Sequence, residues 1–122
     1  MSEREPNVLD GGDDSLGPQR VPVNVYETTE ALVVVAPMPG VMADDVDVVL
    51  EGQELRLEAR LRTAAPKDYL IHEWDYGAYE RVLPLPEGFA GDATASLGNG
   101  QLAVRVAREG NRAESAVVVQ PD

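Results

Sequence analysis

The sequence contains no cysteine and a single histidine, His72, among its 122 residues. Without cysteine there can be no disulfide framework, thiolate zinc site or cysteine nucleophile, and one histidine excludes a multi-histidine metal centre. No apolar run approaches the roughly 18 residues that a membrane-spanning helix needs. The first residues are acidic and polar, unlike a signal peptide. We therefore expect no metal, no cofactor, no membrane partner and a cytoplasmic location.

Positive charge is also scarce, with 10 Lys and Arg residues against 22 Asp and Glu residues and a net charge of −12. A surface this negative repels phosphate backbones and anionic lipid headgroups. Nucleic acid is therefore not an expected partner. The chain length suits one domain with a core of its own.

Candidate catalytic groups are few. The four serines form no G-x-S-x-G elbow, and His72 is the only histidine that could serve as a base. The stretch 98–103 fits the loose dinucleotide pattern G-x-G-x-x-A, but period-two residues follow it where a helix is required. We therefore expect no catalytic residue and no enzyme activity, and a carbohydrate-active or other hydrolase is the least favoured class.

Polar and apolar residues divide the chain into three parts. Residues 1–20 hold seven charges, three glycines and two prolines, which predicts a short flexible arm. Residues 21–107 carry the apolar alternation of a folded domain. Residues 108–122 form a polar tether that ends in an isolated apolar patch, Ala116 to Val119.

Alternation with period two predicts strands throughout the central part. About eight are expected, at 21–26, 31–36, 46–50, 55–61, 69–74, 79–83, 93–97 and 102–106. Pro39-Gly40 suits a type II turn, and Asn99-Gly100 between two alternating runs is a strong hairpin signal. With no long helical pattern, the chain is predicted to be all-β and to form an antiparallel two-sheet sandwich.

Four short stretches resemble motifs of the small heat-shock protein (alpha-crystallin) family. They are A-P-M-P-G-V at 36–41, L-R-L-E-A-R at 55–60, the series Glu73, Gly77, Tyr79 and Arg81 leading to Leu85-Pro86, and A-S-L-G-N-G-Q-L at 95–102. They occur in the family's order and span roughly residues 21–107. This resemblance implies an immunoglobulin-like sandwich that acts as an ATP-independent holdase, capturing partly unfolded clients before they aggregate.

The resemblance also implies self-association. Family dimers form when a loop strand of one subunit pairs with a sheet edge of another, and the matching loop here is 62–68. It places the dimer interface at Tyr69, Ile71, Gly77 and Arg81. For Arg81, a solvated charge on an outward strand face is the alternative.

The apolar patch near the end of the chain resembles the family's I-x-I or I-x-V docking motif, in the form Val117-x-Val119. Such a motif adds a strand to a sheet edge, while two side chains of one face fill pockets. Docking on a neighbour and folding back onto the same domain both remain open. An exposed apolar groove is expected among Val46, Val48, Leu50, Val82 and Leu83.

The arm at 1–20 is less apolar than the family's usual arm, so we expect a dimer or small oligomer. The leading hypothesis is therefore a holdase whose partners are itself and partly unfolded client proteins. The alternative is a sandwich-fold co-chaperone that binds a partner chaperone.

Overall fold

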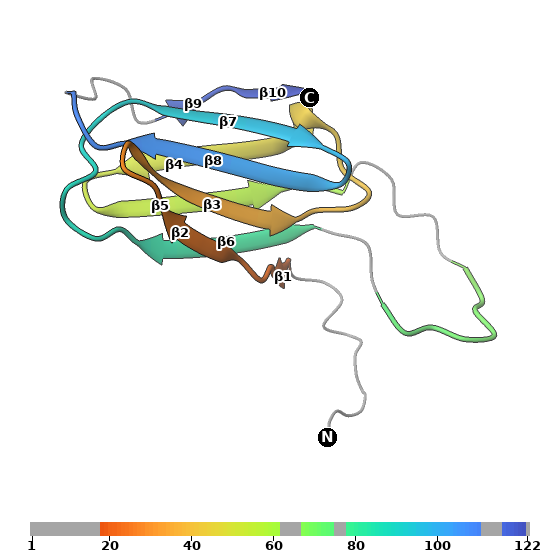
Figure 1. Ribbon diagram of the computed structural model, residues 1–122. Helices are drawn as coiled ribbons and strands as arrows, with labels where there is room; N and C mark the ends of the chain where they lie inside the picture. The colour runs from red at the N-terminus through yellow and green to blue at the C-terminus, as the bar shows by residue number, and fades with distance from the viewer. Residues whose placement is uncertain (1–17, 62–66, 75–77, 111–115, 122) are drawn as a thin grey trace.

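The alternating residues fold into two sheets that pack face to face as a β-sandwich (Figure 1). The computed structural model describes residues 18–61, 67–74, 78–110 and 116–121. One sheet has the order β1 (Gln19–Arg20), β6 (Tyr79–Pro84), β5 (Glu54–Ala59), β4 (Val46–Glu51) and β9 (Ala116–Val117). The other has the order β10 (Val119–Pro121), β7 (Ala93–Gly98), β8 (Gln101–Ala107), β3 (Ala31–Pro37) and β2 (Asn24–Glu27). A 3-10 turn, η2 (Ala43–Asp45), precedes β4.

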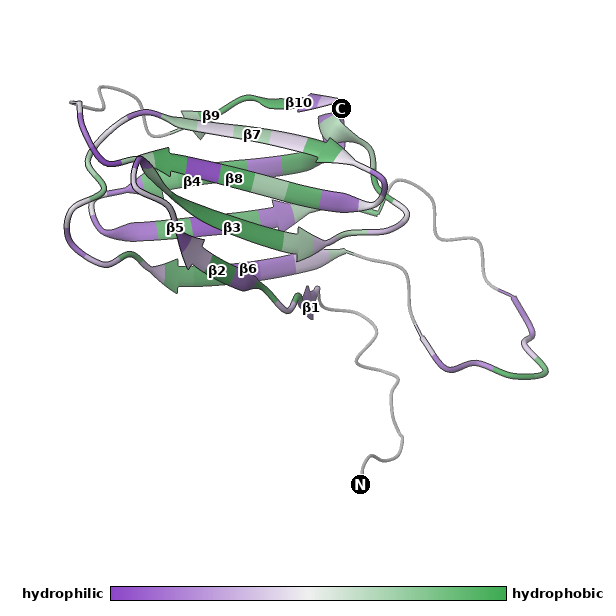
Figure 2. Cartoon of the chain, in the orientation of Figure 1, coloured by the Kyte–Doolittle hydropathy of each residue, from purple (hydrophilic) through white to green (hydrophobic). Residues whose placement is uncertain are grey.

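The core lies between the sheets and is built from every second residue of the longer strands. Along β5, Leu55, Leu57 and Ala59 are buried, whereas Glu54 and Arg56 are exposed. In Figure 2, hydrophilic bands interrupt the mainly hydrophobic length of β8. Each fully buried aliphatic side chain contributes about 1.5–3 kcal/mol, so this stripe pattern stabilises the sandwich. The predicted all-β sandwich is confirmed.

Two predicted turns have the backbone that their residues favour. Asn99 (φ 53°) and Gly100 (φ 73°) both have positive φ and join β7 to β8, as a type I′ hairpin requires. Gly40 has φ 90° and follows Pro39, as in a type II turn. These local signals fix the reversals of the chain.

The ends of the domain differ from the sequence-based prediction. The described residues form ten strands, because Gln19 and Arg20 form β1 and the chain end forms β9 and β10. β1 runs parallel to β6, and β10 runs parallel to β7, so both sheets are mixed rather than purely antiparallel. Each pair is distant in the chain, so no hairpin turn joins β1 to β6 or β7 to β10 and sets an antiparallel direction.

The strand predicted at 69–74 is absent. The described residues 67–74 contain no strand and project beyond one end of the sandwich (Figure 1). Their apolar residues have no described sheet of this chain to pair with, and a strand without a ladder leaves its backbone groups to water. Gly77 lies outside the described residues, as does most of the loop at 62–68.

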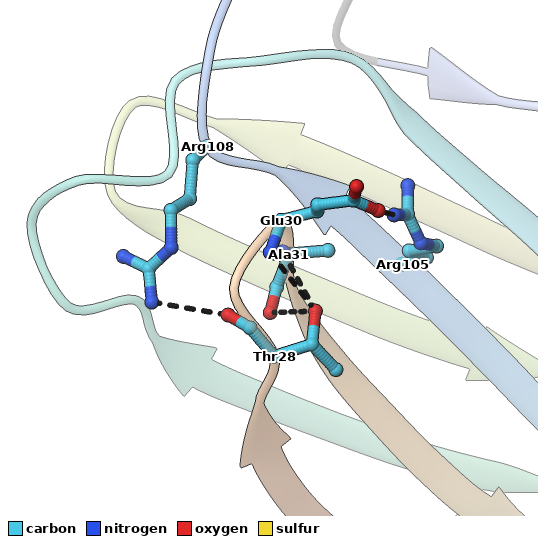
Figure 3. Close-up of polar contacts among 5 residues, drawn as sticks. All are labelled: Thr28, Glu30, Ala31, Arg105 and Arg108. Carbon is cyan, nitrogen blue, oxygen red and sulfur yellow. Dashed lines mark hydrogen bonds and ion pairs between the residues drawn. The ribbon is translucent and has the colours of Figure 1, made fainter.

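Arg108 ties together the end of the sandwich where β2 turns into β3 (Figure 3). Its Nη2 donates to Glu27 Oε1 at 2.8 Å and to the carbonyl of Thr28 at 3.2 Å. Its guanidinium carbon lies 4.5 Å from the ring centroid of Phe89. Thr28 Oγ1 closes the turn by accepting from the amides of Glu30 and Ala31. One side chain thus joins three segments that are distant in sequence.

Replacing Arg108 with alanine should lower the free energy of unfolding by about 1–2 kcal/mol, because a half-buried cation–π contact and a charge-assisted hydrogen bond are lost together. The matched control is Arg105→Ala, which removes an ion pair with Glu30 at 3.3 Å; Arg105 lies in β8, which ends just before Arg108, and its side chain is more exposed. Exposed pairs of this kind contribute about 0–1 kcal/mol. Urea unfolding of both variants measures the difference, and equal losses would contradict the role given to Arg108.

Candidate functional site

The projecting segment at 67–74 exposes more large apolar surface than any other described part of the chain. The exposed fractions are 51% for Tyr69, 102% for Leu70, 75% for Ile71 and 57% for Trp74. Contiguous apolar surface of this kind on a water-soluble domain marks an interaction site. The structure therefore places two of the expected interface residues, Tyr69 and Ile71, on a surface open to a partner.

Within this segment, Tyr69 and His72 stack. Their ring centroids lie 4.5 Å apart with an interplanar angle of 21°. The side chain of His72 is exposed. The stack restricts the two rings and gives the segment local order without any strand pairing.

β2 is the outermost described strand of its sheet. It pairs with β3 on one side, and no described strand lies on its other side. Its four residues are all exposed, with Val25 at 47% and Tyr26 at 54%. An uncovered edge presents free N–H and C=O groups that can pair with another chain. β2 is thus a second candidate interaction surface.

The apolar tail docks on its own domain. β9 pairs antiparallel with β4, with Val117 opposite Val48, and β10 pairs parallel with β7, with Val119 opposite Ala95. The tail therefore passes from one sheet to the other along one edge of the sandwich (Figure 1). A short covalent tether gives the tail a high effective concentration at its own edge, which favours this placement over a neighbour.

Replacing Val119 with alanine should destabilise the docked tail, because Val119 is only 9% exposed. Losing about two methylene groups from this site should cost about 1.5 kcal/mol. Val118→Ala is the control, since the Val118 side chain is 74% exposed and should cost under about 0.5 kcal/mol. Hydrogen exchange of the β10 amides reports the difference, and equal protection in both variants would argue against this anchoring.

The residues expected to line an exposed apolar groove do not form one. Val46, Val48 and Leu50 are 6%, 1% and 2% exposed and belong to the core, at the edge where β9 is paired. Val82 and Leu83 are successive residues of β6, so they point to opposite faces and line no common groove. The prediction is therefore wrong for this set. Residue alternation marks the side chains that face the core, but it does not show that the chain's own tail pairs along the edge of β4.

Arg81 points inward, so the alternative of a solvated charge on an outward strand face is wrong. Its Nη1 donates to the carbonyl of Val21 at 2.9 Å. Its Nε is buried and has no hydrogen-bond partner. Arg81 thus holds the segment next to β1 against β6, a contact that the sequence alone did not indicate.

The described residues contain no group of three His, Asp or Glu side chains placed to hold a metal ion. Nor does any helix among them have the length and apolar character needed to cross a bilayer.

Comparison with known proteins gives a consistent result. Residues 24–120 match the model of the Hsp20/alpha crystallin family. Spore protein SP21 of Stigmatella aurantiaca is 34% identical over 82 residues, which cover 64% of this chain and 48% of that protein. The matched part therefore spans about half the length of this curated relative.

Solved structures show the same sandwich. The Del-C4 mutant of hsp14.1 from Sulfolobus solfataricus P2 is 28% identical, with a TM-score of 0.63 over 76% of this chain and 79% of that one. Heat shock protein 16.0 from Schizosaccharomyces pombe has a TM-score of 0.65 at 19% identity, over 89% of this chain and 79% of that one. HSP18.5 from E. histolytica also reaches 0.65, at 17% identity over 77% and 92%. With the family model matching most of its length, the chain belongs to the Hsp20/alpha crystallin family of small heat-shock proteins.

Proposed function

We propose that this chain is an ATP-independent holdase that binds partly unfolded clients and prevents their aggregation. The observation that carries the proposal is the exposed apolar segment at 67–74 on a domain of this family. A holdase needs surface that recognises exposed apolar chain, and it needs no bond to be made or broken. We assign no catalytic residue, and a cytoplasmic location remains part of the proposal.

Self-association follows from the same surfaces. In this proposal the segment at 67–74 of one copy lies along the open edge of β2 in a second copy, and separation of the two copies frees both surfaces for clients. Main-chain hydrogen bonds would supply the pairing, and Tyr69 and Ile71 would pack beside the exposed Val25. Because the tail covers its own edge, it offers no second link between copies. A dimer or small oligomer is therefore the proposed assembly.

The negative charge suits the loaded state. A net charge of −12 keeps complexes with aggregation-prone chains apart through mutual repulsion. Clients would then be held at sheet edges while acidic side chains face the solvent.

The experiment is to heat a labile enzyme with and without the chain in the absence of ATP and to record turbidity. The expected result is suppression that increases with the ratio of chain to enzyme. Unchanged turbidity at several-fold excess would contradict the proposal. In that case the alternative, a co-chaperone that binds a partner chaperone, would be tested by direct binding.

A further inference from the structure

The outer edge of β6 is only partly covered. β1 contributes two residues against the six of β6. Two backbone hydrogen bonds hold it there, from Gln19 N in β1 to Ala78 O at 2.9 Å and from Val21 N, just after β1, to Glu80 O at 3.1 Å. From Arg81 to Pro84, no described strand pairs with this side of β6. The edge therefore has room for a longer extended segment than the one that occupies it.

The outer face next to this edge carries an acidic row. Strand register places Glu80 of β6 opposite Glu58 of β5, and Glu58 opposite Asp47 of β4. Like charges on neighbouring strands are unfavourable, so the row favours cations at its ends. Arg60 donates to Asp47 at 2.8 Å at one end, and the register of β1 places Arg20 opposite Glu80 at the other.

On the core-facing side of the same edge, the paired segment must present an apolar side chain. Val21 directly follows Arg20 and is 1% exposed. Arg81 Nη1 holds the segment by donating a hydrogen bond to the Val21 carbonyl, while the buried Nε of Arg81 has no partner. Residues 19–21 thus leave the Nε donor of Arg81 without an acceptor. A different segment that supplies a second acceptor would therefore be favoured in their place.

We propose that the edge of β6 is a binding site for extended client segments in which a basic residue is followed by a β-branched or other apolar residue. Residues 19–21 are the resident occupant that such segments displace. The basic side chain lies beside Glu80, the apolar side chain enters the core, and the carbonyl accepts from Arg81. This inference rests on the proposed holdase function and names a class of segment that it captures.

The test uses the full chain and a fluorescent seven-residue peptide with the sequence of residues 18–24. Arg20→Glu in the chain should release the resident segment, because a carboxylate then faces Glu80. Peptide binding, measured by fluorescence anisotropy, should tighten by about five- to tenfold relative to the unmodified chain. The gain should shrink at about 0.5 M NaCl, since these exposed charges are screened.

A charge swap is the matched control. A chain with Glu80→Arg should bind the peptide that carries Arg20→Glu and should reject the original peptide. Equal binding of both peptides to every chain, or no gain with Arg20→Glu, would overturn the inference. An Arg20→Glu assembly with twice the mass of the unmodified assembly, in the absence of peptide, would also overturn it. That mass would mean that a further copy of the chain occupies the edge of β6. Intact suppression of aggregation alongside failed peptide binding would reject this site alone.

Discussion

Replacing Gly91 with alanine is expected to lower the free energy of unfolding by about 3 kcal/mol, a shift of roughly 10 °C in Tm. An added Cβ would lie 2.2 Å from the carbonyl oxygen of Glu109 and 2.9 Å from that of Ala107. Both are backbone atoms, and the Gly91 amide donates to that same Ala107 carbonyl at 2.8 Å. The strand end must therefore move, and the chain connecting β8 to the tail moves with it.

The matched control is Gly52→Ala in the turn between β4 and β5. Gly52 has φ +57°, but no atom lies within 4 Å of an added Cβ. Its cost should be about 1–2 kcal/mol from backbone strain alone. Thermal unfolding of both variants separates steric overlap from strain. A Gly91→Ala chain as stable as Gly52→Ala would contradict the close approach of the two backbones.

Replacing Leu70 and Ile71 together with serine is expected to weaken self-association by about 100-fold or more, because central apolar side chains dominate interface energies. Both side chains are exposed within one chain, so folding stability should change by less than about 0.5 kcal/mol. Sedimentation velocity across a concentration series measures the change. The double variant should sediment as a monomer at concentrations where the original chain forms a dimer.

Met42→Ser is the control for that experiment. Met42 is 62% exposed and lies next to η2, and it belongs neither to β2 nor to the segment at 67–74. Its replacement should leave the sedimentation behaviour unchanged. If the double variant associates as strongly as the original chain, the segment at 67–74 does not form the interface.

Local sequence signals predicted most of the sandwich because each of them acts over a few residues. Asn99-Gly100 fixes a hairpin, Gly40 fixes a turn, and the alternation in 55–59 fixes which side chains enter the core. The tail alternation also holds, since Val119 is buried and Val118 is exposed. None of these features needs information about distant parts of the chain.

The failures arise where a residue's partner is distant or belongs to another molecule. Residues 69–74 contain the apolar run Tyr69 to Ile71 that was interpreted as a strand, but they have no described sheet to join, so local composition alone was misleading. Val48 was expected in an exposed groove, yet β9 lies beside it. The close approach at Gly91 and the inward bond of Arg81 depend on residues that are 16 or more positions away in the chain, so no local pattern reports them.

The edges of the two sheets therefore differ in how much of each is covered by the chain's own ends. The tail covers the β4 and β7 edges, residues 19–21 cover part of the β6 edge, and β2 has no described cover. A chain whose sheet edges are partly covered by its own ends, and whose β2 edge is paired in the proposed dimer, needs those ends to give way or the two copies to separate before it can hold a client. Capture should consequently increase as temperature loosens the short terminal strands.

The most direct test is whether a soluble complex with an unfolded client forms without nucleotide. The chain and a heat-labile enzyme are heated together at equal concentrations, centrifuged, and passed through size exclusion with light scattering. The expected result is that both proteins stay in the supernatant and elute together at a mass above that of either alone. Elution of the chain at its own mass, with the enzyme in the pellet, would contradict the holdase function.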